Sequence, residues 1–190
     1  MVKGEAFLLA SLIIVVSLVL MYLPMRREYL IKQESILKKE YEEKVFENLI
    51  NEIKNTAYIS YGDFDSCIKN LYDFLNFSKK YLNSRGLSFY YLILVGNIST
   101  IMNITGINAF DNTIEINITI DKNNSKNLII NEYSINSILF SLIGDEKEIE
   151  IEYKDVKKSV NLNGNLILYL DLLIDSADYS KRYVDVFVYR

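Results

Sequence analysis

The sequence has no histidine and no tryptophan, and its 190 residues include one cysteine, one proline and seven glycines. Without histidine, the chain lacks the commonest general base and metal ligand near neutral pH. Cys67 alone can form neither an intramolecular disulfide nor a thiolate metal site, and we expect it to be a small residue packed on a helix. No glycine-rich phosphate-binding loop is present. We therefore expect the chain to be no enzyme and to carry no cofactor.

The chain also has fewer basic than acidic residues, 21 against 25. The formal net charge is −4, whereas nucleic-acid-binding domains usually carry a basic face, so we do not expect nucleic acid as a partner. Half of the residues are hydrophobic, and a chain of this length can build one domain with a substantial core.

The chain does have one long apolar run, Ala6 to Leu23, which contains no charged residue. Its only polar breaks are Ser11, Ser17 and Tyr22. As a helix this run would be about 27 Å long, close to the thickness of the hydrocarbon layer of a bilayer. We predict a transmembrane helix over residues 5–24, with membrane lipid as its partner.

The residues in front of this run, Lys3-Gly4-Glu5, make the start of the chain similar to the class III signal of archaeal type IV pilin-like proteins. The resemblance implies that residues 1–4 are a leader, removed by cleavage between Gly4 and Glu5. It also implies that the apolar helix packs against those of other pilin-like subunits, or of further copies of the chain, in a surface filament. Leu9 stands where bacterial pilins carry a glutamate, so the subunit-registering role of that glutamate is not carried over.

Two other functions fit the same sequence. The chain could be a plain single-span protein that displays a β-rich module to a ligand or partner, or, as a weaker alternative, a membrane-tethered enzyme. Orientation is open as well. Arg26 and Arg27 follow the apolar run and would place the C-terminal part in the cytoplasm by the positive-inside rule. The leader favours export, and we expect a single-pass cell-membrane protein with an extracellular C-terminal domain.

Residues 25–86 have the pattern of two helices. No glycine or proline occurs from Met25 to Ser60, and apolar residues recur at steps of three and four on one face. Pro24 should kink the helix where the apolar run ends. A second helix should follow from about residue 64 to 83, with Asp63 or Asp65 as its N-cap and Gly86 in a left-handed conformation after its end.

Residues 87–190 have the pattern of a β-rich head domain. Short apolar or alternating stretches, such as Thr113 to Ile120, are separated by polar turns, which predicts seven to nine strands. Val156–Leu162 and Leu166–Leu173 flank Asn163-Gly164 and are expected to form a hairpin. The predicted fold is therefore α+β: a transmembrane helix continuing into a long amphipathic helix, a second helix, and a mainly antiparallel sheet or sandwich.

Glycosylation is the modification that the sequence suggests. Acceptor motifs of the Asn-x-Ser/Thr type occur at five positions, of which Asn76 is mid-helix and the least suitable. The candidate sites are Asn97, Asn103, Asn117 and Asn123.

Two acidic groups could in principle hold calcium: residues 145–148, and Asp171 with Asp175 and Asp178. Asp171 and Asp175 could also form a carboxylate pair. Neither group has EF-hand spacing, and charges near turns are usually solvated. We expect no metal site and no catalytic residue.

Overall fold

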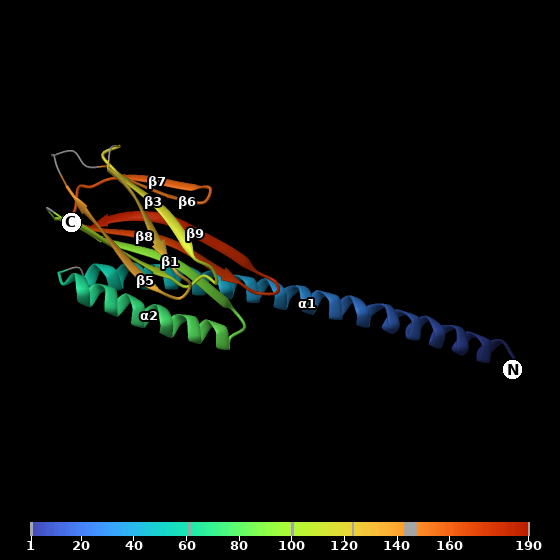
Figure 1. Ribbon diagram of the computed structural model, residues 1–190. Coiled ribbons are helices and arrows are strands. Elements are labelled where there is room, and N and C mark those ends of the chain that lie inside the picture. Colours follow the sequence, from blue (N-terminus) through green and yellow to red (C-terminus); the bar gives the residue numbers. More distant parts are fainter. Residues whose placement is uncertain (1, 61, 100, 123, 143–147, 190) are drawn as a thin grey trace. The chain divides into compact units, whose positions relative to one another are not determined.

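The computed structural model describes residues 2–60, 62–99, 101–122, 124–142 and 148–189, with side chains described from Ser17 onward. The chain divides into two compact units, residues 1–45 and 46–190. Helix α1 (Val2–Ser60) contributes to both units and continues through Pro24 as one helix (Figure 1). Most of the predicted transmembrane segment, residues 5–16, lies outside the described side chains. Within the part that is described, no helix is long and apolar enough to cross a membrane.

Helix α2 (Phe64–Ser84) begins and ends as the sequence predicts. Asp63 is its N-cap and accepts a hydrogen bond from the backbone N–H of Ser66. The Ser66 hydroxyl also donates to Asp63 Oδ2 at 2.6 Å, and this side-chain hydrogen bond, with the backbone one, lowers the pKa of the Asp63 carboxyl. Gly86 follows the helix with φ +77°, a conformation that glycine adopts without the steric cost other residues incur.

The two helices pack together in the second unit. Cys67 on α2 is fully buried, and its Sγ lies 3.7 Å from the carbonyl oxygen of Ala57 on α1. This confirms the packed, small-residue role expected for the cysteine. Burial raises the pKa of the Cys67 thiol to about 11.

In the described residues after Ser84, nine antiparallel strands form two sheets. The five-stranded sheet has the order β5-β2-β1-β8-β9 and the four-stranded sheet the order β4-β3-β6-β7. The strands are β1 (Ser88–Asn97), β2 (Ile101–Asn108), β3 (Ile114–Ile120), β4 (Asn124–Ile130), β5 (Ile135–Ser141), β6 (Glu148–Tyr153), β7 (Val156–Asn161), β8 (Leu166–Asp175) and β9 (Ser180–Tyr189). The α+β class and the mainly antiparallel pairing are thus confirmed, and of the two predicted alternatives, one sheet or a sandwich, the structure has two sheets.

The five-stranded sheet is the middle layer of the second unit. Figure 1 shows α2 on one side of it and strands β3, β6 and β7 on the other. The core between the sheets includes Leu92 and Leu94 of β1 opposite Ile116 and Ile118 of β3. On the other face of β1, the Tyr91 hydroxyl donates to Asn76 Oδ1 of α2 at 3.3 Å. Since β1 and β8 are buried on both faces, they appear in the sequence as continuous apolar runs, whereas β3 has one exposed face and alternates.

The predicted hairpin around Asn163-Gly164 is wrong. Strand β7 pairs with β6 in the four-stranded sheet, whereas β8 pairs with β1 and β9 in the five-stranded sheet. The Asn-Gly pair therefore lies in a crossover between sheets. Gly164 does not have a positive φ; it is needed because a Cβ there would collide with the Tyr189 carbonyl group.

Candidate functional site

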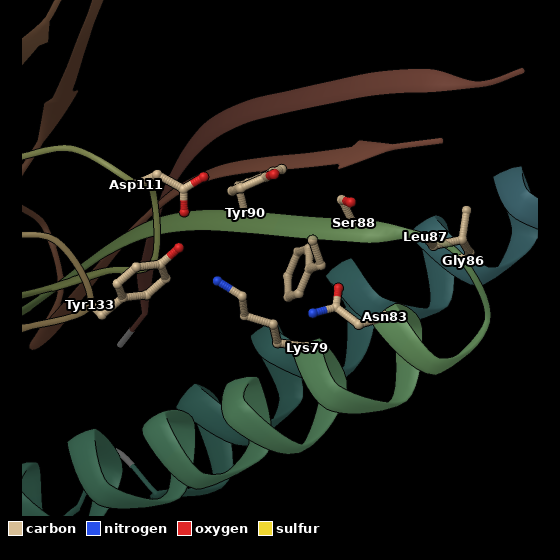
Figure 2. Close-up of a pocket in the computed structure, with 9 residues that line it drawn as sticks. Lys79, Asn83, Gly86, Leu87, Ser88, Tyr90, Asp111 and Tyr133 are labelled. Atoms are coloured by element: carbon tan, nitrogen blue, oxygen red, sulfur yellow. The ribbon is translucent and has the colours of Figure 1, made fainter. Parts of the chain in front are cut away.

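A pocket of about 310 Å³ opens beside the C-terminal half of α2. Its lining comes from α2, the turn that follows it, the start of β1, the β2–β3 loop and the β4–β5 loop. The lining residues are Lys79, Asn83, Gly86, Leu87, Ser88, Phe89, Tyr90, Asp111 and Tyr133. Figure 2 shows the Lys79 side chain extending from α2 toward Asp111 and the ring of Tyr133.

The ammonium group of Lys79 is held by an aromatic and carbonyl cage. Its Nζ donates to the Ala109 carbonyl oxygen at 3.1 Å and lies 4.4 Å from the ring centre of Tyr133 and 5.6 Å from that of Tyr90. A cation over an aromatic face at this range is stabilised by the ring's negative face. Burial lowers the pKa of Lys79, and the negative charge of Asp111 partly opposes that shift.

Asn108, at the end of β2, fixes the two loops that carry Asp111 and Tyr133. It is 1% exposed, and its Nδ2 lies 3.2 Å or less from three carbonyl oxygens, those of Asn112, Ile130 and Asn131. Its Oδ1 accepts the backbone N–H of Phe110 at 2.8 Å. A single buried amide therefore ties the β2–β3 loop to the end of β4.

Tyr133 has an unusual backbone for its type. Its φ is +51°, in the left-handed region that costs residues other than glycine about 1–2 kcal/mol. Burial does not explain this cost, because the side chain is 56% exposed. This conformation places the tyrosine ring over Lys79 at the pocket wall.

The pocket can recognise a small polar molecule. Lys79 donates hydrogen bonds, Asp111 accepts them, and the Asn83 amide and Ser88 hydroxyl do both. The two opposite charges cancel, while Tyr90, Tyr133 and the buried residues below them supply apolar surface. The lining is therefore mainly polar, and it places hydrogen-bonding groups beside aromatic rings, as sites for small polar molecules do.

The predicted leader and glycosylation sites are placed only in part. The side chains of Gly4 and Glu5, and residue Asn123, lie outside the described residues. Asn97 and Asn103 are half-buried and directly opposite each other in the β1–β2 pair. Such partners have Cβ atoms about 5 Å apart, which leaves little room for two glycans. Asn117 lies on the outer face of β3 and accepts a hydrogen bond from Ser125 Oγ at 2.6 Å.

The acidic residues of β8 do not form a carboxylate pair. Asp171 is fully buried and accepts two hydrogen bonds from Arg182, at 2.8 and 2.6 Å. Asp175 is four residues along the same strand, roughly 13 Å away. Residues 145–147 are outside the described part, and among the residues that are described no three acidic or cysteine side chains are grouped to hold a metal ion.

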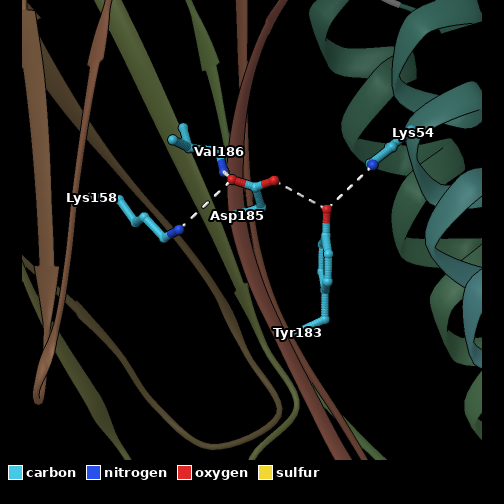
Figure 3. Close-up of polar contacts among 5 residues, drawn as sticks. All are labelled: Lys54, Lys158, Tyr183, Asp185 and Val186. Carbon is cyan, nitrogen blue, oxygen red and sulfur yellow. Dashed lines mark hydrogen bonds and ion pairs between the residues drawn. The ribbon is translucent and has the colours of Figure 1, made fainter.

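A second polar cluster connects α1, β9 and β7 (Figure 3). Lys54 Nζ donates to the Tyr183 hydroxyl at 3.3 Å, which donates to Asp185 Oδ2 at 3.2 Å. The other oxygen of Asp185 lies 3.8 Å from Lys158 Nζ and accepts the Val186 N–H at 2.9 Å. Burial, with a smaller contribution from Asp185, raises the pKa of Tyr183 to about 12. Because its members bind one another, we interpret this cluster as a structural tie.

Sequence reasoning missed the pocket entirely. Lys79, Asp111 and Tyr133 are far apart in the chain and belong to no motif. The one available signal was Asn108, a polar residue that directly follows the apolar Ile107. The apolar stretch Leu128 to Tyr133 predicts a strand, whereas β4 ends at Ile130, so the loop position of Tyr133 was missed as well.

The described residues thus define an α+β protein with a two-sheet β unit and helices packed against one sheet, and the pocket beside Lys79 is of small-molecule size. No family model matches the chain, and no curated protein matches it either.

Proposed function

We propose that the chain is a pilin-like, membrane-anchored protein of the cell surface, acting as a major or minor filament subunit or as an assembly protein. In this proposal α1 carries the transmembrane helix at its start, and residues 46–190 form the extracellular head. The partners are membrane lipid and then the α1 helices of other pilin-like subunits or of further copies of the chain. Helices leaving the bilayer would bury the same apolar surface against one another.

The observation that supports this proposal is the apolar surface of α1. In the described part of the first unit, every large hydrophobic side chain from Leu18 to Tyr41 is 50–68% exposed. The uncharged run Ala6 to Leu23 precedes and overlaps this segment. Such a surface requires cover by lipid or by other helices.

The experiment is the intact mass of the protein extracted from membranes and from sheared surface material. We expect a chain that begins at Glu5, found in both fractions. Gly4→Val should retain residues 1–4 and remove the protein from the sheared fraction. Gly62→Val is the matched control, because a Cβ at Gly62 meets nothing within 4 Å, and it should be processed normally. Native protein beginning at Met1 or Val2 would contradict the proposal.

The pocket beside Lys79 favours a second candidate function. A single-span protein could use the same β unit as a ligand-binding module on an uncut anchor. In that case the protein would be recovered as detergent-soluble monomers with an unprocessed N-terminus.

A further inference from the structure

We propose that the pocket between α2 and the β2–β3 and β4–β5 loops binds a neutral, hydroxyl-rich ligand of the size of one sugar ring. This proposal goes beyond the filament function and does not depend on it, since it concerns only residues 79–133 of the second unit. It gives the second candidate function a ligand class.

The size of the pocket sets the first limit. At about 310 Å³ it lies at the lower end of the range for small-molecule sites, which is roughly 300–1,000 Å³. One ring with its hydroxyl groups fits such a volume, whereas a longer chain would extend into solvent.

The charges of the pocket set the second limit. An anionic ligand drawn to Lys79 would meet the Asp111 carboxylate, and a cationic ligand drawn to Asp111 would meet the ammonium group. A hydroxyl group avoids both conflicts, because it accepts from an ammonium group and donates to a carboxylate at the same time. Asn83 and Ser88, both exposed, offer further donors and acceptors to neighbouring hydroxyls.

Tyr133 supplies the third argument. Its ring is exposed, yet its backbone is held at φ +51°, where asparagine or glycine would be more stable. Strain of this kind concentrates at functional sites. An exposed tyrosine ring beside hydrogen-bonding groups is suited to packing against the apolar C–H face of a sugar.

The test uses the full-length chain in a detergent without a sugar headgroup, such as lauryldimethylamine oxide, because a maltoside would compete. The probes are D-glucose, D-galactose and N-acetyl-D-glucosamine, with glycine and inorganic phosphate as charged comparisons. Saturation-transfer NMR gives binding and titration gives affinity. We expect at least one sugar to bind and neither glycine nor phosphate to do so.

Two variants locate the binding. Tyr133→Asn removes the ring but suits the left-handed backbone, so affinity should fall about tenfold while the melting temperature does not fall. Asp111→Asn, at an exposed position, should also weaken binding with no loss of folding. Tyr72→Asn, an exposed tyrosine on α2 outside the pocket, is the matched control and should bind as the native chain does.

Three results would overturn the proposal. The first is that none of the three sugars binds. The second is that glycine or phosphate binds more tightly than any of them. The third is that Tyr133→Asn and Asp111→Asn both bind sugar with native affinity. None of these results bears on whether residues 1–4 are removed, so failure here is distinguishable from failure of the filament proposal.

Discussion

The side chain of Asn108 makes hydrogen bonds to two loops, and no sequence motif predicts them. Its amide replaces the strand ladder at the end of β2, where two loops must be held without regular pairing. Replacing it with leucine would remove these hydrogen bonds from the buried carbonyl group of Ile130 and from the part-buried carbonyl group of Asn131 and N–H of Phe110. Each buried polar group without a hydrogen-bond partner lowers the free energy of unfolding by about 1–3 kcal/mol.

We therefore predict that Asn108→Leu lowers the free energy of unfolding by roughly 2–4 kcal/mol and abolishes sugar binding. Urea denaturation of the detergent-solubilised chain measures the first effect. Asn112→Ala is the matched control, because only the backbone carbonyl of Asn112 binds Asn108; its effect should be within about 0.5 kcal/mol. Equal stability of the two variants would show that Asn108 does not hold the loops.

At the scale of elements, the sequence was informative wherever burial leaves a local pattern. The alternation of Ile114, Ile116 and Ile118 predicts β3, and the caps at Asp63 and Gly86 bound α2. The choice of which strands pair with one another leaves no such pattern in the sequence. A turn motif such as Asn163-Gly164 marks where the chain changes direction but not which sheet receives the next strand.

The pocket was unpredictable for a related reason. It is formed by one helix, the start of β1 and two loops that connect strands of different sheets, so only the tertiary fold brings its residues together. Tyr133 also contradicts local preference, since a tyrosine is a poor choice for a left-handed position. A prediction based on local propensity misses a site whose residues contradict that propensity.

Gly164 gives an element-scale prediction. A Cβ at this position would meet backbone atoms of Tyr189, and backbone cannot move aside as a flexible side chain can. Gly164→Ala should therefore separate the start of β8 from the end of β9 and destabilise the protein by about 2–3 kcal/mol in urea denaturation. Gly62→Ala, where a Cβ meets open space, should be neutral or stabilising by up to about 1 kcal/mol. A native-like Gly164→Ala would mean that β9 ends differently.

For the whole molecule, the proposal of a membrane anchor makes a prediction about the side of the membrane on which residues 46–190 would lie. Arg26 and Arg27 favour the cytoplasm under the positive-inside rule, whereas the proposed leader favours the outside. The two answers differ in whether a reagent that cannot cross the membrane reaches the second unit.

The lone cysteine makes this question testable. Cys67 is fully buried and burial raises its thiol pKa to about 11, so near pH 7 it is both shielded and protonated and should not react with a maleimide. Lys80→Cys places a thiol on the exposed face of α2. If the second unit is extracellular, a membrane-impermeant maleimide should label this variant in intact cells as fully as in broken cells, and should leave the native chain unlabelled in both. Labelling only after the cells are broken would place the second unit in the cytoplasm, because the arginines after the apolar run would then have set the orientation.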